Sequence, residues 1–273
     1  MAFVAAGEQA SDAAATSRHC DRIDVLPDRT MVCMEARASV LSLTRLSVIR
    51  ADGSVVDSWQ VPGIPSRVRF SPDGDVVAST TFVAGHSYLQ AGFSTSTRLH
   101  RVGGGDEDLE DYTLVLEGEE SRPVNRNYWG VTFADDRAFY ATLRSGDQTW
   151  LVRGDTTTRT LTSLRNDAEC PSLSPDGKHL VYKKRSGYDD TAWTLALLDL
   201  RSGDERLLGE RRSVDDQVEW LDNRTVLYAL PQEGQPGRSD VWQLDTAEGS
   251  EPRLLVTDGA SPSVVPPARP AVE

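Results

Sequence analysis

The chain has 273 residues, of which 29 are Lys or Arg and 42 are Asp or Glu, so its formal net charge at pH 7 is −13. A chain of this length can bury a sizeable core. The negative charge argues against nucleic acid and anionic lipid surfaces as partners, because both repel an acidic protein. Three cysteines (Cys20, Cys33 and Cys170) are too few, and odd in number, for a disulfide scaffold.

The two ends of the chain differ in composition from the part between them. The opening MAFVAAG is apolar but far shorter than the roughly 20 residues that span a bilayer. For residues 1–19 we expect either a disordered tail or the stump of a signal or anchor segment. Residues 267–273 are proline-rich, and we expect them to be disordered. Residues 20–266 are expected to form a single domain.

A twelve-residue pattern occurs five times in this domain. The copies begin at Ile23, Val68, Val131, Pro171 and Val218. Each copy has an apolar third residue, Asp or Asn at the sixth position, and an apolar or aromatic tenth residue. In FSPDGDVVAS (70–79) and LSPDGKHLVY (173–182), Pro presets φ, Asp bonds its own backbone and Gly accepts a positive φ, which predicts tight hairpins. Where Arg29, Arg137 or Arg224 replaces the glycine, we expect a different turn.

Two further strand-like stretches follow each hairpin, such as 191–200 and 206–210 after the fourth copy. Successive copies begin 45, 63, 40 and 47 residues apart, so the second interval must contain an insertion. Four antiparallel strands, repeated at such intervals, predict an all-β fold: a β-propeller of four-stranded antiparallel blades. We expect five blades. Six is the alternative, because SPSVVP at 261–266 resembles CPSLSP at 170–175.

The phrases RFSPDGDVVAS and LSPDGKHLVY resemble the repeat of the TolB-like, or WD40-like (PD40), β-propeller family. The resemblance extends from residue 20 to about 257; it is specific in two copies and degenerate in the other three. It implies a propeller of the kind often found in the bacterial cell envelope. We therefore expect an extracytoplasmic location (periplasmic, cell-surface or secreted), with a membrane tether through an N-terminal helix as an option.

The sequence contains no pattern that points to a reaction. None of the four histidines has a metal-ligand spacing, and there is no GxSxG elbow or nucleotide-binding glycine motif. The acidic stretch 106–111 lacks the alternation of a calcium loop, and we interpret it as a solvated loop. We expect no catalytic residue, no metal and no cofactor.

The cysteines carry a separate expectation. We interpret Cys33 as a buried small hydrophobe within a second strand. A Cys20–Cys170 disulfide is an open alternative outside the cytoplasm.

The face opposite the SPDG turns is expected to collect the long, irregular loops, where a propeller would carry a site. Seven aromatic and arginine residues there are our candidates for binding a partner, because interface hot spots favour these types. They are Tyr88, Arg122, Arg126, Tyr128, Trp129, Arg165 and Tyr188. For Trp129 the alternative is a structural role between blades.

The preferred function is a non-catalytic, monomeric binding module for a protein or peptide of the cell envelope. The alternative is a propeller enzyme, or a receptor for a small ligand or carbohydrate, with its site at the mouth of the channel. In that case the bases or metal ligands would be acidic residues of the connecting loops. The candidates are Asp167, Glu169, Asp215 and Asp216.

Overall fold

The computed structural model of the chain describes residues 2–3, 14–15, 19–37, 42–188 and 191–265. The described part is built of strands, with one short 3₁₀ helix and no α-helix. Most of the tail expected at 1–19, and all of that at 267–273, lie outside the described residues. Within the first tail, β1 (Ala2–Phe3) pairs with β2 (Ala14–Ala15).

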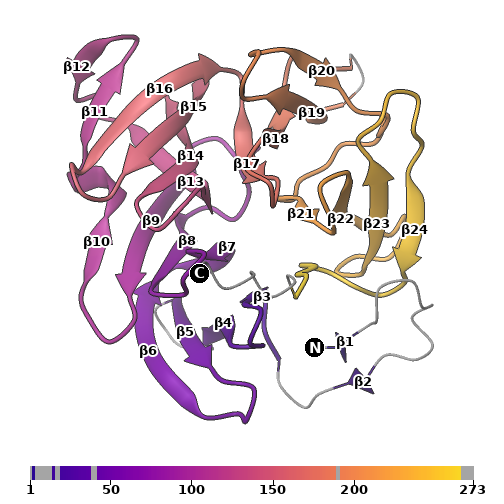
Figure 1. Cartoon of the computed structure of the whole chain (residues 1–273), viewed down its shortest axis with the longest axis horizontal. Coiled ribbons are helices and arrows are strands. Elements are labelled where there is room, and N and C mark those ends of the chain that lie inside the picture. Colours follow the sequence, from indigo (N-terminus) through magenta and orange to yellow (C-terminus); the bar gives the residue numbers. More distant parts are fainter. Residues whose placement is uncertain (1, 4–13, 16–18, 38–41, 189–190, 266–273) are drawn as a thin grey trace, which may run out of the picture. The chain divides into compact units, whose positions relative to one another are not determined.

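Five successive antiparallel sheets, which we call blades 1 to 5, make up the fold (Figure 1). Blade 1 contains β3 (Arg22–Val25), β4 (Met31–Arg37), β5 (Leu43–Ile49) and β6 (Val55–Pro62). Blade 2 contains β7 (Ile64–Phe70), β8 (Val76–Ala84), β9 (Ser94–Arg101) and β10 (Asp106–Asp108). Blade 3 contains β13 (Arg126–Phe133), β14 (Ala138–Ser145), β15 (Gln148–Asp155) and β16 (Thr160–Asn166). Blade 4 contains β17 (Glu169–Leu173), β18 (His179–Lys184), β19 (Thr194–Asp199) and β20 (Glu205–Leu207). Blade 5 contains β21 (Glu219–Trp220), β22 (Thr225–Pro231), β23 (Ser239–Asp245) and β24 (Arg253–Val256).

In every blade the strands follow one another in chain order across the sheet, which is the architecture of a five-bladed β-propeller. This confirms the predicted fold class and the preferred blade number. No sixth blade begins near residue 262, because the described residues 261–265 contain no strand. Instead, the Ser263 hydroxyl donates a hydrogen bond to the Asp24 carboxylate in β3 (3.2 Å).

The chain packs as two compact units, whose main stretches are Asp21–Pro171 and Ser172–Pro262. The first unit contains blades 1 to 3, and its buried side chains form two apolar clusters. The second unit contains blade 5 and most of blade 4, and its core is a single cluster that includes Trp220, Tyr228 and Leu244.

The SPDG hairpins form as their turn chemistry predicts. In blade 2, Phe70 lies opposite Val77 across the turn, and Gly74 has a φ of 81°. The Ser71 hydroxyl donates to the Asp73 carboxylate (2.5 Å), which in turn accepts the Asp75 backbone N–H (3.0 Å). The equivalent turn in blade 4 repeats this pattern, with Gly177 at a φ of 71°.

The arginine-containing turns divide into two kinds. Arg137 and Arg224 do not adopt a positive φ. In these turns the Asp135 and Asp222 carboxylates each accept two backbone N–H groups, that of the arginine and that of the residue after it. The expected difference is therefore confirmed at these two positions. It is wrong at Arg29, which adopts the left-handed conformation with a φ of 66°.

The insertion in the second interval is an ordered hairpin. Its strands, β11 (Thr113–Leu116) and β12 (Glu119–Ser121), extend blade 3 to six strands, with β11 parallel to β16. The acidic stretch before it is not the solvated loop that we expected. It forms β10 and the 3₁₀ helix η2 (Leu109–Asp111), because it pairs with β9 and Arg98 forms ion pairs with both Asp106 and Asp108.

The cysteines also differ from the expectation. Cys20 and Cys33 are disulfide-bonded and Cys170 is free, so in a chain with three cysteines the bond joins Cys20 to Cys33. Cys33 is thus not a free buried thiol, and the Cys20–Cys170 alternative is wrong. Cys170 is 1% exposed and its backbone N–H donates to the Thr142 hydroxyl (2.7 Å).

Candidate functional site

Three of the seven predicted binding residues are buried in the first unit. Tyr88, Tyr128 and Trp129 are at most 2% exposed. The Tyr88 and Trp129 rings stack at a centroid distance of 4.8 Å, and Phe82 and Phe93 complete the cluster at 4.7 Å from Tyr88 and 5.6 Å from Trp129. These rings are therefore not displayed on the loop face as we expected, and the structural alternative describes Trp129 correctly.

The buried rings anchor the loop between β8 and β9 to the neighbouring strands. The Tyr88 hydroxyl lies 2.5 Å from the Ser66 hydroxyl in β7, and the Arg67 guanidinium lies 5.5 Å from the Tyr88 ring centroid. On the blade 3 side, the backbone carbonyl of Tyr128 accepts a hydrogen bond from Thr95 in β9 (2.9 Å). Burial raises the pKa of the Tyr128 phenol to about 12, so this group stays neutral at physiological pH.

The three predicted arginines lie in different environments. Arg126 donates to the backbone carbonyls of Glu110 (2.8 Å) and Pro123 (3.3 Å), so it ties the end of blade 2 to the start of blade 3. Arg122 is exposed, and Arg165 is half-buried in β16. Whether any of these residues contacts a partner stays a prediction.

In the second unit, the seventh predicted residue lies at the surface. Tyr188 is half-buried in the loop between β18 and β19, where two hydrogen bonds hold the residue. The Tyr188 hydroxyl donates to the backbone carbonyl of Leu208 (3.0 Å), and its backbone N–H donates to the Thr194 hydroxyl (2.9 Å). A Cβ on the preceding residue, Gly187, would lie 2.2 Å from that hydroxyl oxygen, so only glycine lets the loop pass this close to β19.

The Arg211 guanidinium stacks on the Tyr188 ring. Its central carbon lies 3.7 Å from the ring centroid, and Arg211 is exposed. Stacking on an aromatic face leaves the N–H groups at the edge of the guanidinium free to donate in its plane. Together the two side chains form what we call the Tyr188–Arg211 pair.

The residues on either side of Arg211 are fixed by a buried carboxylate. Glu210, with a side chain 2% exposed, accepts hydrogen bonds from Arg212 Nε (2.9 Å), Arg212 Nη2 (2.7 Å) and the Tyr228 hydroxyl (2.6 Å). Burial alone would raise the pKa of the Glu210 carboxyl, but these hydrogen bonds outweigh it and lower the pKa below its ordinary value. Arg212 also stacks on Trp242 at 3.8 Å. The backbone that carries Arg211 is therefore held in place.

Sequence reasoning selected Tyr188 but missed its partner. Arg211 is in a connector of arginines and acids whose spacing gives no sign of which side chain is paired. Only the structure shows that Glu210 forms its ion pair with Arg212, whereas Arg211 stacks on Tyr188.

The acids proposed for a site at the channel mouth have other roles. Asp215 forms an ion pair with the buried Lys183 (2.8 Å), and Asp216 accepts the backbone N–H of Ala229 (3.0 Å). Glu169 is fully buried, and Asp167 has a left-handed backbone with a φ of 52°. Among the residues that the structure describes, no group of three His, Cys, Asp or Glu side chains is placed to hold a metal ion.

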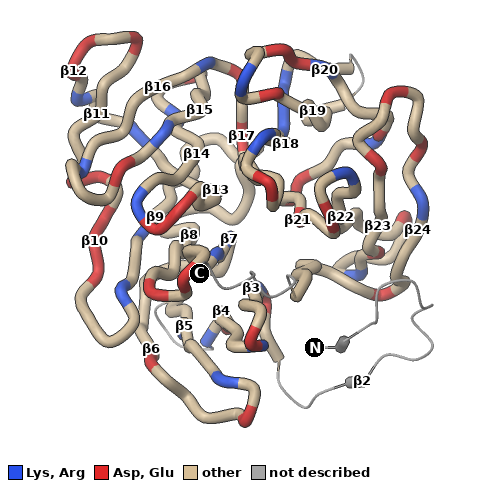
Figure 2. Tube along the Cα trace, viewed as in Figure 1, with Lys and Arg blue, Asp and Glu red and all other residues tan. Residues whose placement is uncertain are grey.

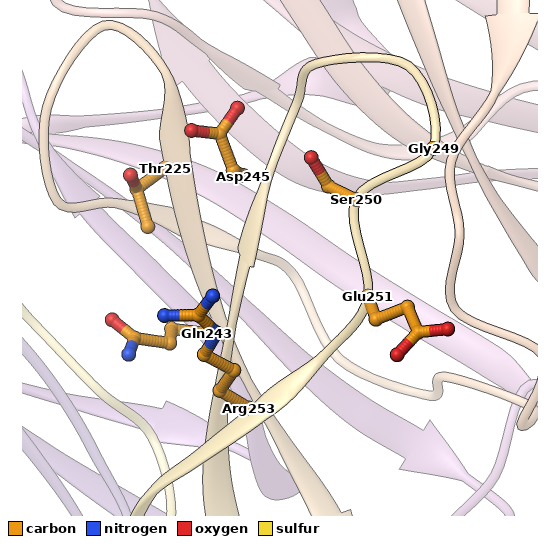
Figure 3. A pocket seen from close by; sticks show the side chains of 7 residues that line it. All are labelled: Thr225, Gln243, Asp245, Gly249, Ser250, Glu251 and Arg253. Carbon is orange, nitrogen blue, oxygen red and sulfur yellow. The ribbon is translucent and has the colours of Figure 1, made fainter.

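A cavity of about 500 Å³ lies at the surface of blade 5 (Figure 3). Its lining combines polar side chains of β22 to β24 with the turn before β24. The residues are Thr225, Gln243, Asp245, Gly249, Ser250, Glu251 and Arg253. No aromatic ring lines it, so it lacks the flat apolar face on which a sugar ring would pack, and Asp245 is already paired with Arg224 (3.1 Å).

No protein-family model matches the sequence, and a search of curated proteins found no match. Solved structures do match in fold. TolB from Acinetobacter baumannii superposes with a TM-score of 0.62 and 17% identity over 89% of this chain, which spans 56% of the TolB chain. A putative TolB from Agrobacterium tumefaciens gives a TM-score of 0.56 and 13% identity over 89% of this chain and 84% of its own.

The similar structures also include an enzyme, an oligogalacturonate lyase in complex with manganese. It gives a TM-score of 0.54 and 13% identity over 83% of this chain and 65% of the lyase. The fold therefore defines this protein as a five-bladed β-propeller. More narrowly its fold is TolB-like, and the oligogalacturonate lyase shares it. Within the described residues, no helix is both long and apolar enough to cross a membrane.

Proposed function

We propose that this protein is a non-catalytic propeller that binds a protein or peptide partner of the cell envelope. The observation that carries the proposal is the Tyr188–Arg211 pair. Tyrosine and arginine are enriched among residues that dominate binding energy, and a side chain already held in place loses less entropy on binding. Arg211 is exposed and Tyr188 is half-buried, and both are held in place by the bonds of Tyr188 to Leu208 and Thr194 and by the hydrogen bonds at Glu210.

Two observations support a location outside the cytoplasm. Disulfides persist in oxidising compartments and are rare in the cytosol, and Cys20 and Cys33 are disulfide-bonded. The similar structures include TolB from Acinetobacter baumannii and a putative TolB from Agrobacterium tumefaciens. We propose a periplasmic, cell-surface or secreted protein.

The charge distribution supports a protein or peptide partner over a nucleic acid. Along the described part of the trace, Lys and Arg are interspersed with Asp and Glu and not gathered in one continuous basic stripe (Figure 2), and the net charge of the sequence is −13. Nucleic-acid binding draws on many phosphate contacts and needs such a stripe.

The proposal is tested by separating binding from stability. Tyr188→Ala and Trp129→Ala each remove an aromatic side chain, one from the Tyr188–Arg211 pair and one from the buried cluster. Affinity capture from envelope extract, quantified by mass spectrometry, is combined with thermal unfolding of each variant. We expect Tyr188→Ala to lose the captured partner with little change in Tm, and Trp129→Ala to lower Tm strongly. If Tyr188→Ala captures the same proteins as the wild type, the proposed site is wrong.

A further inference from the structure

We infer that the Tyr188–Arg211 pair is a receptor for a carboxylate side chain on an acidic peptide segment of the partner. This inference rests on the proposed function and specifies the chemistry of the partner. The exposed Arg211 guanidinium stacks on Tyr188, with its central carbon 3.7 Å from the ring centroid.

Three other arginines of the same unit form ion pairs, unlike Arg211. Arg212 is paired with Glu210 (2.7 Å), Arg224 with Asp245 (3.1 Å), and Arg238 with Asp258. No hydrogen bond or ion pair from Arg211 to the described part of the chain accompanies its stack. Its donors are therefore available to an acceptor from outside the chain.

The planar fork of a guanidinium matches a carboxylate, which can accept two parallel N–H bonds. The stack on Tyr188 fixes the plane of that fork. The Tyr188 ring is itself fixed by its hydroxyl bond to Leu208 (3.0 Å), and the chain beside Arg211 is fixed by Glu210. A carboxylate that docks edge-on to Arg211 thus meets a donor pair that needs little reorganisation.

The surrounding charges favour one carboxylate over a polyanion. Both lysines of β18 are already paired, Lys183 with Asp215 and Lys184 with Glu205 (3.2 Å). An extended polyphosphate or an anionic bilayer would meet the net charge of −13, whereas a peptide presents one acidic side chain at a time.

The test uses a displayed library of random 12-residue peptides, selected on the intact protein. We expect Glu or Asp to be enriched at one position of the selected peptides. In synthetic copies, Glu→Gln or Asp→Asn at that position should weaken binding to the wild type about tenfold or more, because a charge-assisted hydrogen bond is lost. The same peptide change should have less than about a twofold effect on the Arg211→Ala variant.

A matched control is available within the same unit. Arg253 is also exposed but does not stack on an aromatic ring, and it lines the cavity of blade 5 (Figure 3). Arg253→Ala removes the same charge and should leave peptide affinity unchanged. Equal losses in the Arg211→Ala and Arg253→Ala variants would mean a general charge effect and would overturn the inference.

The outcomes also separate the inference from the proposed function. In one outcome, the selected peptides lose affinity in the Tyr188→Ala variant but keep it in the Arg211→Ala variant and after the Glu→Gln change. That result would overturn the carboxylate receptor and leave the proposed partner binding intact. Failure to select any peptide that depends on Tyr188 or Arg211, with capture from envelope extract also unaffected by Tyr188→Ala, overturns both. Arg211-dependent binding of anionic lipid vesicles, or of phosphopeptides without carboxylate dependence, also overturns the acidic-peptide assignment.

Discussion

The buried His100 should make the stability of this protein fall as the pH is lowered below neutrality. His100 is 1% exposed; its Nε2 atom lies 2.8 Å from the Ser79 hydroxyl, and its ring lies 5.0 Å from that of Trp59. Burial lowers the pKa of His100 to about 4, because the carboxylates of Asp106 and Asp57 offset only part of the cost of burying a charged ring.

The direction and the size follow from proton linkage. The unfolded chain takes up a proton near pH 6.5 and the folded chain only near pH 4, so between these values the unfolded state binds more protons and gains stability relative to the fold. Over the full window the difference of about 2.5 pKa units corresponds to about 3 kcal/mol. Between pH 7.5 and pH 5 the loss from this residue alone should be about 2 kcal/mol.

Urea unfolding at constant ionic strength, at pH 7.5 and at pH 5, measures this effect. His100→Gln removes the titrating group and leaves an amide that can still bond to Ser79, so the variant should lose about 2 kcal/mol less than the wild type on acidification. His86→Gln, at an exposed loop position, serves as the control and should behave like the wild type. If wild type and His100→Gln lose the same stability between the two pH values, His100 is not held neutral by burial and the reasoning fails.

Three further changes have defined expectations. Replacing Cys20 and Cys33 together by Ser opens a loop of 14 residues and should lower the free energy of unfolding by about 3 kcal/mol; an unchanged urea midpoint under oxidising conditions would contradict this. Trp129→Ala leaves a cavity at a fully buried site and should lower the free energy of unfolding by about 3–5 kcal/mol, which a thermal melt would show as a lower Tm. An unchanged Tm would place Trp129 at the surface. Glu210→Gln should cost about 2 kcal/mol at pH 7 by weakening the bonds from Arg212 and Tyr228. The folded pKa of Glu210 is lowered, so the extra stability of the wild type over Glu210→Gln is fully present above the unfolded pKa of about 4.3. It should shrink as the pH falls through the folded pKa. A stability difference between the two proteins that stays constant from pH 7 to pH 3 would refute the assignment.

The fold was predictable because its information is local. Each SPDG turn is specified by neighbouring residues, such as Ser71, Asp73 and Gly74, whose bonds all fall within a few positions in the chain. The spacing of the copies then predicted the number of blades, and the one long interval predicted where the insertion lies. Its conformation was not predictable, since the parallel pairing of β11 with β16 joins segments about 47 residues apart.

The candidate site was predictable only in part, because burial depends on distant segments. Tyr88 is in a long loop rich in small and polar residues, which gave no indication that its ring turns inward to stack on Trp129. The disulfide was missed for a similar reason. Its signal was present, because Cys20 comes just before β3 and Cys33 lies in β4 of the same hairpin, but that spacing has meaning only once the register places Cys33 opposite Ile23.

The hairpin β11–β12 shows how this scaffold tolerates added length. It attaches to the outer strand of blade 3, and the pairing of β13 to β16 further inside continues through the sheet beside it. Its own outer strand carries Glu119 and Glu120, whose charges discourage edge-to-edge association. The turn at Glu117 and Gly118 is therefore a suitable point for grafting an affinity tag or a fluorescent reporter, because extra residues there would extend into solvent and leave the remaining strands in register.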